Sequence, residues 1–423
     1  MDKKAIEILE NCKLEDDYFS EKGWVCPLNF HPEVISQLNI PKKVIIHDVT
    51  LRDGEQTAGV AFTTDEKVFL AEELDKIGIP LLEIGFGAVE KDRETFKRLS
   101  KMNLNAKMLA CTRIMEEDVK QAIDCGADGL FLETAINPYV VKHVFGFKNT
   151  EEFIDQIVKC GEIANRAGLF IDFCAWDTFR NSNLEYIKGV YEEVTKRIKV
   201  DQIGISDTFG QAHPLTMQFM VKKMKEWIPD IPLSIHGHND FGLTGANALM
   251  AVTSGADAVE CAFNGLGERA GNIATEEIIS ELEILMGIDT GVNYKELYRI
   301  SKLVSEISKV PVAKTKAIVG SGIFNSESGI VIDIALKLKN KLGIDYGMQP
   351  YSPEAFSRNL SFVGGVGSGK AYVKYKLEEF GLKATDEQVK EIVLKVKTRG
   401  AIIKSALMDD ELRKIIEEIT GKA

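Results

Sequence analysis

The feature that most constrains the fold of this chain is a regular alternation of short apolar runs with longer segments of helical period, which begins near residue 43. Strands covered by helices on both faces of a parallel sheet appear in sequence as continuous β-branched and apolar runs. Eight such runs predict an α/β fold, a (β/α)8 TIM barrel. A doubly wound open sheet is the alternative arrangement of the same elements. The predicted strands are VIIHD (44–48), LLEIGF (81–86), AKMLAC (106–111), GLFLE (129–133), LFIDFC (169–174), QIGIS (202–206), LSIHGH (233–238) and AVECAF (258–263).

The pattern differs on either side of this alternation, so we expect three regions. Residues 1–42 are expected to form a polar N-terminal extension, residues 43–315 the barrel, and residues 316–423 a small, mainly helical region. Within the barrel, TDEKVFLAEELDKIG is an amphipathic helix for which Thr64 is the expected N-cap.

The composition excludes several classes of function. The 52 Lys and Arg residues are outnumbered by 64 Asp and Glu residues, and a net charge of −12 offers no general attraction to nucleic acid or to an anionic membrane. No apolar stretch reaches the roughly 18 residues of a membrane span, and the N-terminus lacks the apolar core of a signal peptide. Seven cysteines without a CxxC pair indicate reduced thiols. We therefore expect a cytoplasmic protein without nucleic-acid or membrane partners.

Polar residues collect where the predicted strands end. In a barrel, the loops that follow the carboxyl ends of the strands form the functional face, so polar side chains there carry more weight than elsewhere. Alternate residues of a strand point to the same side, so both histidines of LSIHGH would face inward. The residues at these positions are Arg52 and Asp53 after strand 1, Glu83 on strand 2, Arg113 on strand 3, Thr208 after strand 6, His236 and His238 on strand 7, and Asn272 after strand 8.

Four of these side chains are suitable ligands for a divalent cation. His236 and His238 offer imidazoles, Asp53 offers a carboxylate, and Asn272 offers an amide oxygen. A set of oxygen and nitrogen donors without a thiolate predicts Mg²⁺ or Mn²⁺, with Zn²⁺ or Co²⁺ as alternatives. The competing interpretation is that the two histidines only satisfy local hydrogen bonds where a strand meets a loop.

Three motifs, HDVTLRDGEQTAG, HGHNDFG and NGLGERAGN, fall in this order on strands 1, 7 and 8 and the loops after them. Together they resemble the motifs of the DRE-TIM metallolyase superfamily. Within it they are most similar to the Claisen-condensing branch, the isopropylmalate, homocitrate, citramalate and Re-citrate synthases. The resemblance covers residues 44–315. Lyases of the superfamily carry a cysteine in the stretch where this chain has Gly267-Glu268-Arg269, so the resemblance favours condensation over cleavage.

The resemblance implies roles for individual residues of this chain. Arg52 matches the arginine that polarises the keto oxygen, and Glu83 matches the carboxylate that holds this arginine. Thr208 and Arg113 match positions that contact the 2-oxo acid. The alternative for Arg52 and Glu83 is a structural ion pair at the mouth of the barrel. The metal ligands of the family match Asp53, His236, His238 and Asn272.

The chain departs from the family pattern where acid–base residues are expected. Trp176 stands where the condensing enzymes usually have a glutamate after strand 5, and Asn137 stands where they commonly have a histidine after strand 4. In the C-terminal region, FNSESGIV places Asn325 and Val331 where the family has histidines. The general base is therefore not identified, and the candidates are His143, Asp177, Glu327 and Asp333.

The stretch GGVGSGK, residues 364–370, fits the GxxxxGK pattern of a phosphate-binding loop. Ala371 follows it, so the hydroxyl that would hold Mg²⁺ in such a loop is missing. We interpret the stretch as a turn with Lys370 near a CoA phosphate, in preference to a nucleotide site.

These observations predict a metal-dependent acyltransferase that joins an acyl-CoA, most simply acetyl-CoA, to a 2-oxo acid and hydrolyses the thioester. The acyl-CoA and the 2-oxo acid are the expected partners, and the resemblance implies a homodimer. An inward-pointing Arg113 would favour an acceptor with a second carboxylate, such as oxaloacetate or 2-oxoglutarate, over a short or branched 2-oxo acid. The alternatives are a carbon–carbon lyase or aldolase of the HMG-CoA lyase type, and a noncatalytic barrel that binds a metal.

Overall fold

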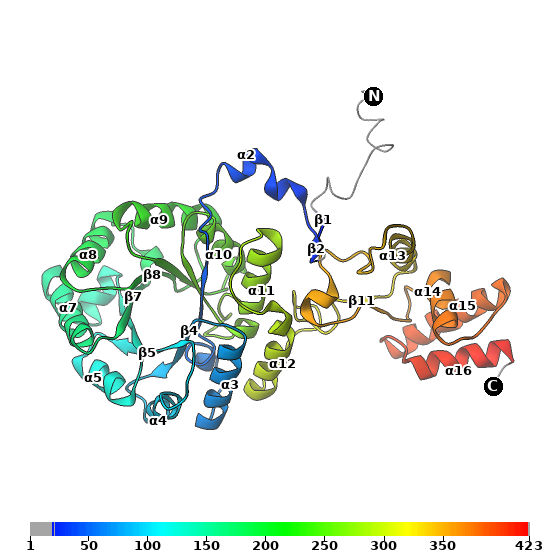
Figure 1. Ribbon diagram of the computed structural model, residues 1–423, viewed down its shortest axis with the longest axis horizontal. Coiled ribbons are helices and arrows are strands. Elements are labelled where there is room, and N and C mark those ends of the chain that lie inside the picture. The colour runs from blue at the N-terminus through cyan, green and yellow to red at the C-terminus, as the bar shows by residue number, and fades with distance from the viewer. Residues whose placement is uncertain (1–18, 21, 422–423) are drawn as a thin grey trace. The chain divides into compact units, whose positions relative to one another are not determined.

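The computed structural model describes residues 19–20 and 22–421, and the chain divides into two compact units. One unit comprises residues 27–312, and the other combines the described residues before 27 with those from 313 onward. In Figure 1 the first unit runs from blue to yellow-green, and the last helices of the second unit are orange and red. The three regions expected from the sequence, 1–42, 43–315 and 316–423, stay a prediction.

The first unit contains a closed barrel of eight parallel strands, in the order β10-β3-β4-β5-β6-β7-β8-β9. Strands β10 and β3 close the ring, with Ala258 to Cys261 paired to Ile45 to Asp48. This pairing confirms the TIM barrel and excludes the open sheet, in which these two strands would not pair. The strands are β3 (Ile45–Asp48), β4 (Leu81–Phe86), β5 (Lys107–Arg113), β6 (Gly129–Ala135), β7 (Phe170–Trp176), β8 (Gln202–Asp207), β9 (Leu233–Gly237) and β10 (Ala258–Cys261).

Helices surround the strands, as Figure 1 shows. The N-cap of α3 is Thr63, one residue before the expected Thr64: the Thr63 hydroxyl accepts from the amide of Glu66, and the Glu66 carboxylate accepts from the amide of Thr63. The expectation was wrong because this reciprocal pair needs a hydroxyl three residues before the glutamate. The helices and helical turns of this unit are η2 (Pro27–Phe30), α2 (Pro32–Ile35), η3 (Gly54–Gln56), α3 (Thr64–Lys76), α4 (Glu90–Leu99), α5 (Glu116–Cys125), α6 (Pro138–His143), α7 (Thr150–Arg166), η4 (Thr178–Arg180), α8 (Leu184–Arg197), α9 (Pro214–Trp227), α10 (Thr244–Val252), η5 (Phe263–Gly265), α11 (Thr275–Ser280), η6 (Glu281–Leu285), η7 (Tyr294–Glu296) and α12 (Leu297–Ser308).

The second unit is mainly helical, as expected for the C-terminal region. Its apolar core includes Tyr372, Ile392, Val396 and Leu412, all fully buried. Two small sheets accompany the helices, an antiparallel pair of β1 with β2 and a parallel pair of β11 with β12. The elements are β1 (Phe19–Ser20), β2 (Gly23–Trp24), β11 (Asn325–Ser326), α13 (Gly329–Leu342), η8 (Pro353–Phe356), β12 (Ser361–Phe362), α14 (Lys370–Glu379), α15 (Asp386–Ile403) and α16 (Asp409–Thr420).

The glycine-rich stretch 364–370 lies between β12 and α14. Its Gly367 amide donates to the Glu327 carboxylate at 2.6 Å. A Cβ on Gly365 would come within 2.6 Å of the same carboxylate, so the loop is packed against a side chain of its own unit. An internal carboxylate thus lies against the loop where a bound phosphate would lie in a nucleotide site.

The helices and the cysteines can be compared with what the composition predicts. Over the described residues, no helix combines the length and the apolar character that crossing a membrane requires. The described cysteines are all free, and all but Cys26 are buried. Free, mostly buried thiols agree with the predicted absence of a disulfide framework.

Candidate metal centre and active site

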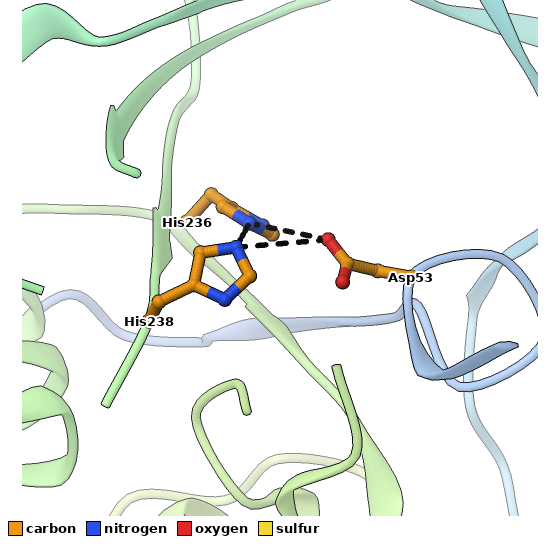
Figure 2. A group of neighbouring side chains, drawn as sticks. All are labelled: Asp53, His236 and His238. Carbon is orange, nitrogen blue, oxygen red and sulfur yellow. Dashed lines mark hydrogen bonds and ion pairs between the residues drawn. The ribbon is translucent and has the colours of Figure 1, made fainter. Parts of the chain in front are cut away.

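Asp53, His236 and His238 come together at the carboxyl end of the barrel, as Figure 2 shows. His236 lies on β9, His238 follows that strand directly, and Asp53 lies in the turn after β3. The Nε2 atoms of the two histidines are 3.2 Å apart. Oδ2 of Asp53 is 3.5 Å from Nε2 of His236 and 3.8 Å from Nε2 of His238. The three side chains are buried and offer one ligand atom each to a single cation.

Asn272 joins this cluster from the loop after β10. Its backbone forms an isolated β-bridge with that of His238, and its amide nitrogen donates to the Leu266 carbonyl at 2.8 Å. The amide oxygen of Asn272 and Oδ1 of Asp53 are buried without a hydrogen-bond partner. A Cβ on Gly267 would lie 2.3 Å from the Asn272 amide nitrogen and 3.1 Å from Oδ1 of Asp53, so this approach needs glycine. Buried oxygens without donors are costly unless a cation or water binds them, so these residues fit a divalent metal.

The electrostatics of the cluster favour the metal-binding forms of Asp53 and His238, whereas Glu260 outweighs burial and raises the pKa of His236. Burial would raise the pKa of Asp53, but Arg52 and the two histidines outweigh burial and hold this pKa below its usual value. Burial, together with the neighbouring charge of His236, lowers the pKa of His238 to about 4. An ionised carboxylate and a neutral imidazole are the forms of these side chains that bind a divalent cation.

Arg52 lies beside the cluster and is held by Glu83 from β4. Its Nε donates to Oε2 of Glu83 at 2.5 Å, and its Nη1 donates to Oδ2 of Asp53 at 3.0 Å. Its Nη2 is buried and has no hydrogen-bond partner. The guanidinium carbon lies 5.1 Å from the centre of the Phe131 ring. Arg52 therefore keeps one unused donor group beside the cluster, in the manner of a residue that stabilises charge on a carbonyl oxygen.

A second cluster of histidine and carboxylates lies in the barrel interior, and sequence reasoning missed it. His47 on β3 is fully buried, with Nε2 3.3 Å from Glu83 and Nδ1 3.4 Å from Asp172. Glu260 completes the cluster and contacts Nδ1 of His236 at 3.0 Å. Burial opposes protonation of His47, but Asp172 and Glu83 outweigh it and raise the pKa of His47 to about 10. His47 is therefore a counter-ion for the buried carboxylates around it.

A cavity of about 330 Å³ opens beside Asp53 and the two histidines. Thr208 and Trp176 line it, and the Thr208 hydroxyl accepts from the Asp177 amide at 2.8 Å. Arg113 does not line it, because its side chain is 60% exposed and donates to Asp118 at 2.7 and 3.0 Å. The structure therefore brings together seven of the eight predicted site residues, and the position of Arg113 gives no support to its predicted contact with the 2-oxo acid.

Three of the four candidate bases are engaged in other contacts, and the fourth, His143, is exposed. Asp177 binds Arg180 through both oxygens, at 2.6 and 2.8 Å, and His143 is exposed at the end of α6. Neither of them lines the cavity. In the second unit, Asp333 pairs with Lys337 at 2.5 Å, and Glu327 is bonded to the glycine-rich loop.

Glu133 on β6 lines the cavity, and sequence reasoning missed it as well. Burial raises its pKa, while Arg52 opposes this effect. One signal is shared by Glu133 in GLFLE, His47 in VIIHD and Asp172 in LFIDFC: each is an ionisable residue within an otherwise apolar run. Such a residue is expensive to bury without a partner or a ligand, and this cost could have identified all three.

Comparison with known proteins places the chain in a family. Residues 43–304 match the family model described as HMGL-like. Homocitrate synthase AksA of Methanopyrus kandleri is 36% identical over 92% of this chain and 95% of that protein. The 2-isopropylmalate synthase of Methanocaldococcus jannaschii is 35% identical over 92% of this chain and 74% of that protein. The (R)-citramalate synthase CimA of the same organism is 35% identical over 90% of this chain and 75% of that protein.

Solved structures of more distant proteins share the barrel. The HMG-CoA lyase of Bacillus subtilis aligns with a TM-score of 0.58 and 21% identity, over 65% of this chain and 97% of that one. The carboxyl transferase domain of Rhizobium etli pyruvate carboxylase aligns with a TM-score of 0.53 and 17% identity, over 72% of this chain and 54% of that one. At these identities the likeness establishes the fold alone. The family match and the synthases that share more than a third of their residues establish that the chain belongs to the HMGL-like family, in the Claisen-condensing branch of the DRE-TIM metallolyase superfamily.

Proposed function

We propose that this chain is a metal-dependent acyltransferase that condenses an acyl-CoA, most simply acetyl-CoA, with a 2-oxo acid. A carbon–carbon bond forms between the acyl methyl carbon and the keto carbon of the acceptor, and water hydrolyses the thioester. The products are a 2-hydroxy di- or tricarboxylate and CoA. The observation that carries the proposal is the buried set of Asp53, His236 and His238 beside Arg52 at the carboxyl end of the barrel, in a chain whose relatives are synthases.

Different side chains of the site would bind the cation and the 2-oxo acid. Asp53, the two histidines and Asn272 would hold the cation, for which we propose Mg²⁺ or Mn²⁺, with Zn²⁺ or Co²⁺ as alternatives. The bound cation supplies an electrophile for the keto oxygen of the acceptor. Arg52 would donate from its unpartnered Nη2 to the same oxygen, and the ion pair with Glu83 fixes the direction of that donor. Thr208 is proposed to contact the carboxylate of the acceptor.

A free-thiol assay tests the proposal. Purified protein with Mn²⁺ or Mg²⁺ and acetyl-CoA is titrated with oxaloacetate, 2-oxoglutarate, pyruvate and 2-oxoisovalerate, next to an Asp53→Ala control. We expect release of CoA that depends on the 2-oxo acid and is lost in the control. Absence of release with every acceptor would contradict condensation with acetyl-CoA, and release of acetyl-CoA from a 3-hydroxyacyl-CoA would favour a lyase instead.

The homodimer implied by the resemblance is also part of the proposal. Light scattering of the purified protein after size-exclusion chromatography gives the mass in solution. We expect twice the chain mass of 46.9 kDa, and a mass equal to one chain would contradict the dimer.

A further inference from the structure

The wall of the cavity that faces the proposed cation comes from β6 and β7. In the ring order, β6 lies across the barrel from β10. The neighbours of β10 are β3, which leads into the turn with Asp53, and β9, which carries His236. Alternate residues of a strand point to the same side, so Phe131 and Glu133 of β6 both face the cavity, next to Cys174 and Trp176 of β7. A 2-oxo acid held by the cation through its keto acid group would direct its remaining chain toward this wall.

The cationic side chains that line this cavity of the barrel unit are Arg52 and Arg269. Arg52 is paired with Glu83 and Asp53, and its one free donor group is needed for the keto oxygen. Arg269 binds both oxygens of Asp240, at 2.9 and 3.0 Å. Both guanidinium groups are therefore neutralised by carboxylates, and neither comes from the strands of the facing wall.

The facing wall carries an acid in place of a cation. Glu133 is half-buried among the aromatic and thiol side chains that line the cavity, and the thiol of Cys111 is its hydrogen-bond partner. Arg113, which pairs in register with Glu133 on the neighbouring strand, is bound to Asp118 outside the cavity. A second carboxylate on the acceptor would lose its hydration at this wall without gaining a cationic partner, and it would meet a like charge whenever Glu133 is ionised.

We infer that the acceptor is a short 2-oxo acid without a second carboxylate, and that Glu133 is the specificity-determining residue that rejects dicarboxylic acceptors. This inference rests on the proposed function for the binding of a 2-oxo acid at the cation. It replaces the preference for oxaloacetate or 2-oxoglutarate that an inward Arg113 would have given. The aromatic rings of Phe131 and Trp176 suit an aliphatic chain such as that of pyruvate or 2-oxobutanoate.

Calorimetric titration of the Mn²⁺-loaded full-length protein, without acyl-CoA, measures acceptor binding separately from turnover. We expect pyruvate or 2-oxobutanoate to bind at least about tenfold more tightly than 2-oxoglutarate, since unpaired buried charge is the strongest basis for rejection. In Glu133→Gln this ratio should fall by about tenfold, mainly through tighter binding of 2-oxoglutarate. Glu268→Gln, which removes an acid from the exposed rim of the same cavity, should leave the ratio unchanged.

Tighter binding of 2-oxoglutarate than of pyruvate and 2-oxobutanoate by the wild type would overturn the inference, and this result does not depend on the folding of any variant. An unchanged ratio in Glu133→Gln, or an equal change in Glu268→Gln, would also overturn it. Discrimination between acceptors in this titration without any CoA release in the thiol assay would support the inference on binding while contradicting condensation. Failure of the inference about the acceptor can therefore be distinguished from failure of the proposed condensation.

Discussion

The barrel contains two buried clusters of the same residue types: the mouth cluster, Asp53 with His236 and His238, and the interior cluster, His47 with Asp172 and Glu260. The mouth cluster lines a cavity, whereas the residues of the interior cluster have no exposed surface. The pKa values of His238 and His47 shift in opposite directions, that of His238 in the mouth cluster to about 4 and that of His47 in the interior cluster to about 10. The pKa of His236 is raised as well, because its contact with Glu260 outweighs burial.

The ratio of carboxylates to cations explains this difference. Burial opposes the charged form of both histidines, but His47 has Glu83 and Asp172 in contact and Glu260 nearby, whereas His238 shares one aspartate with a second histidine. Excess negative charge protonates a buried histidine, and a protonated imidazole is not a metal ligand. His238 is therefore available to a cation at the mouth, whereas His47 neutralises the carboxylates around it in the interior.

The largest expected effect is the loss of Mn²⁺ binding when a carboxylate is removed from the mouth cluster, compared with the same change in the interior cluster. Asp53→Asn removes the carboxylate of the mouth cluster, and we expect Mn²⁺ binding and thiol release to fall by about 10³-fold or more. Asp172→Asn makes the same change in the interior cluster and should reduce Mn²⁺ affinity by about tenfold at most. Calorimetric titration of Mn²⁺ measures both variants, and equal losses would show that the clusters do not differ in function.

Glu83 connects the two clusters, because one of its oxygens binds Arg52 and the other contacts His47. Glu83→Gln removes one of the two carboxylates that pair with the Arg52 guanidinium, and we expect kcat of the thiol assay to fall by about 100-fold. Mn²⁺ affinity should change much less, since Glu83 is not a member of the mouth cluster. A loss confined to Mn²⁺ affinity, with kcat retained at saturating metal, would argue that Arg52 has no part in the reaction.

The interior cluster should appear in the pH dependence of stability. The pKa of His47 rises from 6.5 in the unfolded chain to about 10 in the fold, so its stabilising contribution is complete below pH 6.5 and is lost as pH rises through 10. Between pH 7 and pH 9 this loss amounts to about 2 kcal/mol. Urea unfolding in EDTA at both pH values measures it, and His47→Gln should remove most of the difference. An equal pH dependence in the variant would mean that His47 is neutral in the folded protein.

The smallest effect is expected at Ser234, which lies beside Glu260 of the interior cluster. Its hydroxyl donates to Glu260 at 2.8 Å, and Glu260 in turn contacts His236. Ser234→Ala removes one buried hydrogen bond and should cost about 1 to 2 kcal/mol of unfolding free energy. Mn²⁺ affinity should fall by only about threefold, because Glu260 keeps its contact with His236. A loss as large as that of Asp53→Asn would indicate that Glu260 itself takes part in the mouth cluster.

Most of the barrel could be predicted from the sequence because it depends on local patterns. Apolar runs alternating with helical segments specify eight strands, and the rule that function gathers at the carboxyl ends of barrel strands selects Asp53, His236 and His238. The position of a cap is less certain, since Thr63 and Thr64 are both hydroxyl residues and only the contact with Glu66 distinguishes them.

Arg113 and Glu133 show what only the tertiary structure decided. They pair in register on neighbouring strands, and both are charged residues at the end of an apolar run. Arg113 turns out to Asp118 at the start of α5, whereas Glu133 lines the cavity. The sequence by itself determined the strands, the barrel and the residues at its mouth, because hydrophobic periodicity and backbone geometry are local. The direction of a long side chain, and the charges that a buried histidine meets, depend on partners from other strands, and only closure of the barrel brings these together.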